Sequence, residues 1–319
     1  MKFALDAQQR DFAASIDSAL AAADVPAAVR AWSTGDTAAG RKVWAQLADL
    51  GVTALAVPER FDGLAAHPVD VVVALERLGR WCVPGPVVES VAVAPILLAE
   101  DERAAALASG ELITAVALPP QVPRAVDADT AGLVLLADSS GRVSAAEPGR
   151  QHKSVDPSRR LFDVTATGTG WDADARLAYE FGVLGTAAQL IGAAQALLKA
   201  AVDYAKQRAQ FGRVIGSYQA IKHKLADVHI AIELARPLVY GAALSLAGAS
   251  PDAARDVSAA KAATADAALL AARSALQTHG AIGFTTEHDM SLWLLRVQAL
   301  RPAWGDPATH RRRVLNALI

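Results

Sequence analysis

Apolar side chains in the first third of the chain recur at helical spacing. Phe12, Ile16 and Leu20 are four positions apart, which places them on one face of a predicted helix. Two more stripes each precede a glycine, a residue that commonly ends helices; they are Trp44, Leu47 and Leu50 before Gly51, and Val72, Ala74, Leu75 and Leu78 before Gly79. This third of the chain is therefore predicted to be helical.

The pattern changes near residue 111, where short apolar runs replace the helical spacing. Residues 112–118 and 133–137 are rich in Val, Ile and Leu, and clusters of Pro, Gly, Asp and Ser separate and follow them. Such runs between turn residues predict strands. The region ends near residue 170, and its length of about sixty residues limits it to a small sheet or partial barrel.

Helical spacing returns near residue 175. Predicted helices run from there toward Gly212 and then over 219–246, 252–279, 289–300 and 309–318, with Pro237 expected to kink the second or mark a junction. Such a series of antiparallel helices predicts a bundle. The chain is thus predicted to be mainly α with a small β domain; the expected domains are an N-terminal helical domain (1–110), a β domain (111–172) and a C-terminal four-helix bundle (173–319).

The composition excludes several classes of function. With 319 residues, of which 53% are hydrophobic and 20% charged, the chain is predicted to be globular. A net charge of −2 provides no basic surface for nucleic acid or an anionic membrane. Charges interrupt the N-terminus and the Ala-rich stretches, so we expect no signal peptide, no membrane span and a cytoplasmic location. The single cysteine, Cys82, is expected to be a buried thiol, and no disulfide or metal site is expected.

The most informative chemistry lies at the predicted corner between two C-terminal helices. Arg208, Gln210 and Phe211 are expected in the last turn of a helix that ends at Gly212, and the next helix begins near Gln219. A guanidinium offers forked donors to phosphate, and an aromatic ring offers a face to a base. The residues alone leave two interpretations open: a nucleotide diphosphate site, or an ordinary helix corner with a surface arginine.

Several separated motifs resemble the acyl-CoA dehydrogenase family, in the family's order. The R-x-Q-F-G motif at 208–212 precedes an I-x-x-x-Q-A-I segment at 215–221. The segment at 277–284 resembles the family's Q-x-x-G-G-x-G-F loop, with Ala281 in place of the second glycine. Near the N-terminus, residues 50–64 resemble the family's L-G-V-x-x-L-x-V-P-E-x-x-G-G-L. The resemblance covers both helical regions.

This resemblance implies an N-terminal helical domain, a middle β domain and a C-terminal helical bundle. In that family FAD lies between the β domain and the bundle, and its ADP half reaches a neighbouring subunit. The neighbour's two C-terminal motifs hold the pyrophosphate and adenosine, with backbone N–H groups near phosphate. The implied FAD-binding residues are Arg208, Gln210, Phe211, Gln219, Gln277, Gly280 and Gly283.

The resemblance fails at the catalytic base. Family members use a glutamate to remove the α-proton of an acyl-CoA thioester, and the β-hydrogen leaves as hydride to the flavin. Trp304 or Gly305 stands at that position here, and neither can accept a proton. Other members place the base on the helix before the R-x-Q-F-G motif, where this chain has Gly182.

Three acids remain as candidates for a relocated base. Asp306 is expected to be the N-cap of the last helix. Glu180 lies two residues from Gly182, which turns it about 200° around a helix. Glu287 is interpreted as an acid near a helix N-terminus, where the dipole favours it.

The β region also departs from the family. The family's T-E-P-x-x-G-S-D-like and K-x-W-I-T-N-like segments hold the flavin ring; A-L-P-P at 117–120 stands in place of the first, and the second has no counterpart. The resemblance therefore implies the shortened, non-catalytic subunit of an actinobacterial heterotetrameric (α2β2) steroid acyl-CoA dehydrogenase. Such a subunit would share FAD with a second dehydrogenase subunit, act on an acyl-CoA substrate and pass electrons to an electron-transfer flavoprotein.

Two alternatives stay open. The chain could be a self-sufficient homo-oligomeric acyl-CoA dehydrogenase with a relocated base, or a flavin-free structural protein on the same scaffold.

Overall fold

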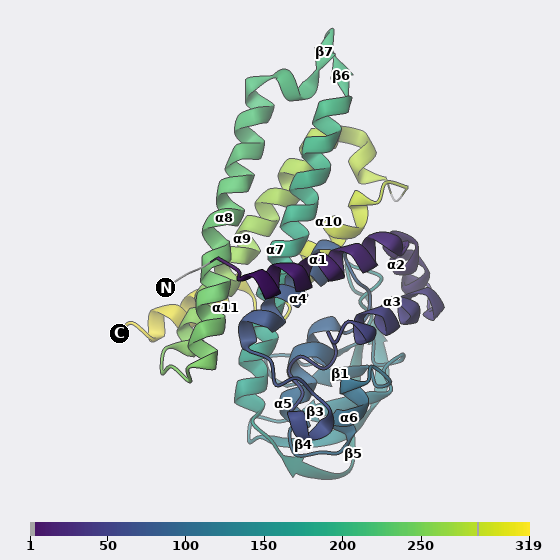
Figure 1. Cartoon of the computed structure of the whole chain (residues 1–319), viewed down its shortest axis with the longest axis vertical. Helices are drawn as coiled ribbons and strands as arrows, with labels where there is room; N and C mark the ends of the chain where they lie inside the picture. Colours follow the sequence, from purple (N-terminus) through teal and green to yellow (C-terminus); the bar gives the residue numbers. More distant parts are fainter. Residues whose placement is uncertain (1–3, 286) are drawn as a thin grey trace.

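The computed structural model describes residues 4–285 and 287–319 and shows long helices in the C-terminal half, with shorter helices and a five-stranded sheet beside them (Figure 1). The α-helices are α1 (Ala7–Ala22), α2 (Val25–Ser33), α3 (Ala38–Asp49), α4 (Pro68–Arg80), α5 (Ala94–Leu97), α6 (Arg103–Ala108), α7 (Ala175–Gln207), α8 (Gln219–Ala247), α9 (Ala253–His279), α10 (Met290–Leu300) and α11 (Pro307–Asn316). Shorter turns are the 3-10 helices η1 (Glu59–Phe61), η3 (Ile215–Ser217) and η4 (Gly280–Phe284) and the π-helical turn η2 (Glu89–Val93). The strands are β1 (Thr114–Ala117), β2 (Ala125–Val126), β3 (Leu133–Ala137), β4 (Arg142–His152), β5 (Leu161–Asp172), β6 (Ala209–Gln210) and β7 (Arg213–Val214).

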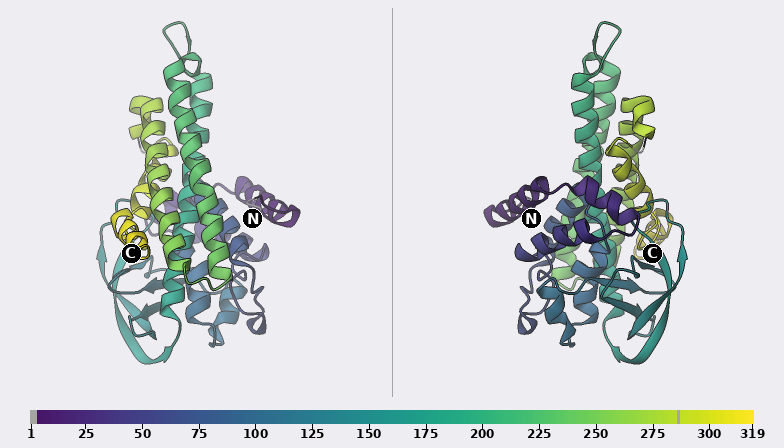
Figure 2. Two further views of the ribbon diagram at one scale, coloured as in Figure 1. Left: turned by 90° about the vertical axis from the view of Figure 1, so that its left-hand side faces the viewer. Right: turned by 90° about the vertical axis from the view of Figure 1, so that its right-hand side faces the viewer.

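The long helices α7, α8 and α9 pack against one another within the region predicted to be a four-helix bundle, and the shorter α10 packs against α7 and α9 and α11 packs against α9. The apolar positions of α7 are buried along most of the helix, including Leu184, Leu190 and Leu197. Each such leucine contributes about 1.5–3 kcal/mol to folding. The α7–α8 hairpin projects well beyond the sheet and the N-terminal helices, as Figure 2 shows from two sides. Pro237 lies inside α8, which is assigned as one continuous helix, so it does not separate two helices.

Glycines allow α4 of the N-terminal region to approach α7 closely. A Cβ on Gly79 would lie 2.3 Å from the carbonyl oxygen of Gln189, and one on Gly192 would lie 1.9 Å from that of Glu76. The prediction that Gly79 ends a helix is therefore wrong, because α4 continues to Arg80 and its glycine serves the helix crossing instead. Gly51, at φ 77°, does follow the end of α3 as predicted.

The small β region is a five-stranded sheet in the order β1-β3-β4-β5-β2. The β1–β3 pair is parallel, with Thr114 opposite Leu133, and the other pairs are antiparallel. Small side chains such as Ala115 and Ala117 form a separate cluster on one face together with Phe162. The sheet stands beside the end of the bundle that lies far from the β6–β7 hairpin (Figure 1).

Among residues 4–285 and 287–319, two helices are long and apolar enough to cross a membrane by length and composition alone, and the bent pair α1 and α2 would be a third if taken as one span. The two helices are α7 and α8, each with an 18-residue window that contains at most two charged residues. The expectation that charges interrupt every such stretch is therefore wrong. In α7 the apolar character has a structural reason, because 78% of its window is buried inside the fold, against 33% for α8.

Candidate functional site

The predicted nucleotide corner is a β-hairpin at the far tip of the bundle (Figure 1). Helix α7 ends at Gln207, so Arg208 is its C-cap and the expected last turn over 208–211 is not helical. Phe211 and Gly212 instead adopt positive φ angles of 52° and 79° between β6 and β7. Phe211 is 92% exposed, and the exposed Arg208 side chain has no hydrogen bond to any described residue. These two side chains are thus free to contact another molecule.

The other predicted FAD-binding segment, residues 277–283, lies where α9 ends, near the base of the hairpin (Figure 1). Lys224 of α8 donates a hydrogen bond to the Oε1 atom of Gln277, and Tyr204 stacks on His279 with ring centroids 4.3 Å apart. Gly280 has φ 65°, and a Cβ at Gly283 would lie 2.8 Å from the Cε atom of Met290. The remaining predicted FAD residue, Gln219, is exposed at the start of α8, as predicted.

The two positions where the family carries its base face each other in this chain. A Cβ on Gly182 would lie 2.3 Å from Cε3 of Trp304, so the indole occupies the space between them. Trp304 is 2% exposed, and its Nε1 donates to Oε1 of Glu89 at 3.2 Å. An apolar ring thus fills the place where a family member would hold a carboxylate against its substrate.

Buried polar groups hold the loop that carries Trp304, whose φ of 57° is unusual for a large side chain. The carbonyl oxygen of Trp304 accepts hydrogen bonds from Nε2 of His310 at 2.9 Å and from the Tyr179 hydroxyl at 3.2 Å. The Nζ atom of Lys261 donates to the carbonyls of Arg301 at 2.8 Å and Gly305 at 3.1 Å. These contacts fix the indole in its place.

This loop should loosen in mild acid because of His310. Burial, followed by the charge of Lys261, lowers the pKa of His310 from 6.5 to about 4. The unfolded chain therefore binds more protons between these values, and unfolding free energy is lost as pH falls from 6.5 to 4. The shift is worth about 3 kcal/mol. In urea titrations, the unfolding free energy of wild type should exceed that of His310→Gln by about 3 kcal/mol less at pH 4 than at pH 7.5. An equal difference in unfolding free energy at both pH values would contradict this prediction.

The three candidate acids have separate structural roles. Asp306 caps α11, as predicted, by accepting a hydrogen bond from the backbone of Thr309 at 2.7 Å, which lowers its pKa. Glu180 is 5% exposed and pairs with Arg313; burial raises its pKa and the arginine opposes this. Glu287 lies on an exposed turn just before α10 and outside its first turn, so its favourable interaction with the N-terminus of that helix stays a prediction.

Two charged residues that the sequence did not predict lie beside Trp304. Glu89 and Arg159 are 1% and 3% exposed and line a pocket of about 240 Å³ together with Trp304. Glu89 could have been predicted from the sequence as a buried functional acid, because it is the only charged residue in the apolar run at 87–98. Arg159 could not have been predicted in this way, because it lies in a polar loop beside Arg160 and nothing in the sequence sets it apart.

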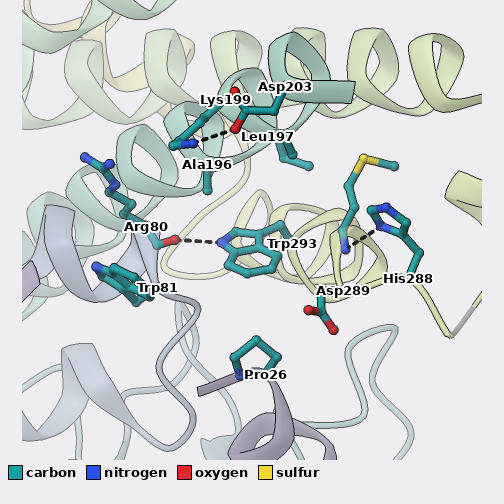
Figure 3. Close-up of a pocket in the computed structure, with 12 residues that line it drawn as sticks. Pro26, Arg80, Trp81, Ala196, Leu197, Lys199, Asp203, His288, Asp289 and Trp293 are labelled. Carbon is teal, nitrogen blue, oxygen red and sulfur yellow. Dashed lines mark hydrogen bonds and ion pairs between the residues drawn. The ribbon is translucent and has the colours of Figure 1, made fainter. Parts of the chain in front are cut away.

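A larger apolar pocket of about 290 Å³ lies where the N-terminal helices meet the bundle (Figure 3). Trp293 forms one wall, and its Nε1 already donates to the carbonyl of Arg80 at 2.9 Å. Lys199 is paired with Asp203 at 2.5 Å. Figure 3 shows these contacts as dashed lines. The polar groups of Trp293, Lys199 and Asp203 are thus already engaged with one another or with the backbone. Cys82 is buried as predicted, and burial raises the pKa of its thiol to about 11.

Comparison with known proteins explains the order of these elements. The sequence model of the acyl-CoA dehydrogenase N-terminal domain matches residues 6–103, and that of the acyl-CoA dehydrogenase C-terminal domain matches residues 168–319. Acyl-CoA dehydrogenase IpdE2 of Mycobacterium tuberculosis is 33% identical over 300 residues, which cover 91% of this chain and 90% of that protein. The chain belongs to the acyl-CoA dehydrogenase family.

Two solved structures share the acyl-CoA dehydrogenase fold with this chain. A chain of the ChsE4–ChsE5 complex from Mycobacterium tuberculosis matches with a TM-score of 0.86 at 22% identity, covering 100% of this chain and 99% of that one. A chain of a variant of the Tcur3481–Tcur3483 steroid ACAD matches with a TM-score of 0.85 at 18% identity, covering 98% and 97%. The expected fold, mainly α with a small β domain, is thereby confirmed.

The FAD of acyl-CoA dehydrogenases fits one part of this chain and not another. The exposed guanidinium of Arg208 and the exposed ring of Phe211 suit the ADP half of a dinucleotide. Between sheet and bundle, where the family holds the flavin ring, the Trp304 indole occupies the space beside Gly182, next to a pocket of about 240 Å³; a second pocket of about 410 Å³ lies between the β region and helices α7 and α11. The residues present therefore fit FAD at the hairpin tip but not its ring in the interior.

Proposed function

We propose that this chain is the non-catalytic subunit of a heterotetrameric (α2β2) FAD-dependent acyl-CoA dehydrogenase, inactive alone. The observation that carries the proposal is Trp304, which fills the space between the two positions where the family has its glutamate. A partner subunit of the same family supplies the carboxylate and the contacts to the flavin ring. This chain supplies the hairpin tip and the α9 corner to the shared FAD.

In such an assembly, bound FAD supplies the hydride acceptor for α,β-dehydrogenation of a CoA thioester. The role of this chain is binding. Arg208 donates hydrogen bonds to the pyrophosphate, Phe211 provides a face for the adenine, and Gly280 leaves its backbone open for close approach because nothing lies within 4 Å of a Cβ built there.

An exposed apolar face on α8 supports an assembly of several chains. Ile230, Leu234 and Leu238 are 54%, 71% and 43% exposed and four residues apart, so they lie on one face of the helix. Apolar side chains grouped in this way are typical of protein–protein contact surfaces.

The substrate class follows from relatives. The Tcur3481–Tcur3483 protein is a steroid ACAD, and ChsE4–ChsE5 is a complex of two differently named chains. We therefore infer a steroid-derived acyl-CoA substrate, with an electron-transfer flavoprotein as acceptor and a cytoplasmic location as parts of the same proposal.

Expression of the chain alone and together with an acyl-CoA dehydrogenase from a neighbouring reading frame tests the proposal. We expect a stable complex with the flavin absorption spectrum and thioester oxidation, and neither property in the lone chain. Stoichiometric flavin and turnover in the lone chain would favour a homo-oligomeric enzyme instead. A stable complex without flavin bands would favour a structural protein.

Arg208→Ala in that complex should weaken FAD retention about tenfold to a hundredfold, because a charge-assisted hydrogen bond to phosphate contributes about 1.5–3 kcal/mol. FAD released on dilution, followed by fluorescence, measures the effect. Lys206→Ala is the matched control, since Lys206 is an exposed cation in the last turn of α7 without a predicted role. Equal retention in both variants would remove Arg208 from the FAD site.

A further inference from the structure

The pocket beside Trp304 lies between the β region and the loop after α10. Its lining is mostly apolar and comes from segments far apart in the sequence, chiefly Val122, Val126, Leu161, Ala299, Pro302 and Trp304. Exposed Gln121 also lines it, so the pocket communicates with solvent. A volume of about 240 Å³ is far above the minimum for one water molecule and gives room for a small organic molecule.

Arg159 brings a positive charge to this pocket. It is 3% exposed, yet its guanidinium makes no hydrogen bond or ion pair with the described part of the chain. Its charge favours the ionised forms of Asp156 and Asp127, but each of these carboxylates pairs with another arginine: Asp156 lies 2.6 Å from Arg296, and Asp127 lies 3.6 Å from Arg160. Because no anion is hydrogen-bonded to this guanidinium in the described part of the chain, an anion that reaches it from the pocket would be bound favourably.

Glu89 brings an unused acceptor to the same pocket. Its Oε1 accepts from the Trp304 indole, while its Oε2 is buried and has no partner among residues 4–285 and 287–319. Glu89 is fixed at the start of the π-helical turn η2 and is 1% exposed. A ligand hydroxyl could satisfy this oxygen, whereas a second carboxylate next to it would be repelled.

We propose that this pocket binds a small hydroxycarboxylate with a compact apolar body. Arg159 binds the carboxylate, the apolar walls enclose the body, and Oε2 of Glu89 accepts a hydrogen bond from the hydroxyl. The site lies at the sheet end of the molecule, away from the hairpin that is proposed to contact FAD (Figure 1). The pocket also lies beside Trp304, in the gap where the family holds the flavin ring, so the test below uses the chain alone and its failure would leave the co-expression test of the proposed function unaffected.

Isothermal titration calorimetry on the full chain tests this with 4-hydroxybenzoate as the probe. We expect saturable binding with one site per chain. Benzoate should bind about tenfold more weakly, because it lacks the hydroxyl. Neutral 4-hydroxybenzyl alcohol should bind at least about tenfold more weakly, because it lacks the charge. No saturable binding, equal binding of the neutral alcohol, or tighter binding of inorganic phosphate would each overturn the proposal.

Variants of Arg159 and Glu89 test which side chain contacts which group of the bound hydroxycarboxylate. Arg159→Gln should weaken 4-hydroxybenzoate about tenfold to a hundredfold, whereas Arg124→Gln, a control at the pocket edge whose arginine already pairs with Asp163, should change it less than about threefold. Glu89→Gln should reduce the preference for 4-hydroxybenzoate over benzoate. If Arg159→Gln fails to fold, Arg159→Lys retains the charge and should retain the preference for carboxylate over alcohol. Equal affinities of Arg159→Gln and wild type would overturn the assignment.

Discussion

Asp156→Ala is expected to lower the free energy of unfolding by about 3–5 kcal/mol, because it leaves Arg296 buried without its counter-ion. Arg296 is 1% exposed, and its Nε lies 2.6 Å from Oδ2 of Asp156. Burial disfavours the charged form of Asp156, but Arg296 and Ser158 hold its pKa below the ordinary value. Both groups are therefore charged in the folded chain at neutral pH.

The position of Arg296 explains why the effect should be large. The side chain extends from α10 and donates to the carbonyl of Val83 at 2.9 Å in the N-terminal region and to Oγ of Ser158 at 3.0 Å in the β region. One guanidinium thus joins three parts of the chain. Removing Asp156 should therefore also loosen the docking of the sheet against the helices, which should raise amide hydrogen exchange in β4 and β5.

Chemical denaturation of Asp156→Ala and Asp266→Ala checks this prediction with a matched control. Asp266 pairs with Arg311 on the surface, where the two side chains are 53% and 56% exposed, so its loss should change stability by less than about 1 kcal/mol. The double variant Asp156→Leu with Arg296→Met should be more stable than Asp156→Ala, because it buries no unpaired charge. Equal unfolding free energies for the two alanine variants would show that the buried pair is not needed.

The helices could be predicted from the sequence, whereas half of the sheet could not. Regular apolar spacing predicted α9 almost to its ends and α7 from its start, because one face of each helix is buried along its length, but α7 ends at Gln207 and not at Gly212. Strands β1 and β3 are buried and appear as apolar runs. Strands β4 and β5 are mostly exposed, and β4 contains both Pro148 and Gly149, so no alternation of apolar residues marks them.

Part of the candidate site could likewise be predicted from sequence motifs, whereas the rest depends on the tertiary fold. The resemblance assigned Arg208 and Gln277 to one FAD site; in the structure Arg208 follows the end of α7, and Gln277 lies in the last turns of α9, but their role in FAD binding stays a prediction. Glu89 and Arg159 are seventy positions apart in the sequence (159 − 89). Only the folded chain brings them to one pocket. The contact between Trp304 and Gly182 likewise depends on the tertiary fold, although the absence of an acid at both positions was visible in the sequence.

Trp304→Ala is expected to lower the free energy of unfolding by about 3–5 kcal/mol, the usual range for removing a large buried aromatic side chain. The indole is 2% exposed and packs against Gly182 and near Tyr179, whose ring centroid is 6.0 Å away. Trp304→Phe keeps most of this packing but leaves Glu89 without its hydrogen-bond donor. It should therefore cost only about 1–3 kcal/mol.

The same pair of variants separates a space-filling role from a catalytic one. Because Trp304 has no group that can remove a proton, Trp304→Phe in the complex with the partner subunit should oxidise the thioester at the wild-type rate below its unfolding temperature. Steady-state turnover, measured beside thermal denaturation of the same preparations, tests this. Turnover lost in Trp304→Phe without a change in thermal denaturation would mean that the indole takes part in the reaction. That result would return the catalytic site to this chain and remove the reason for a partner.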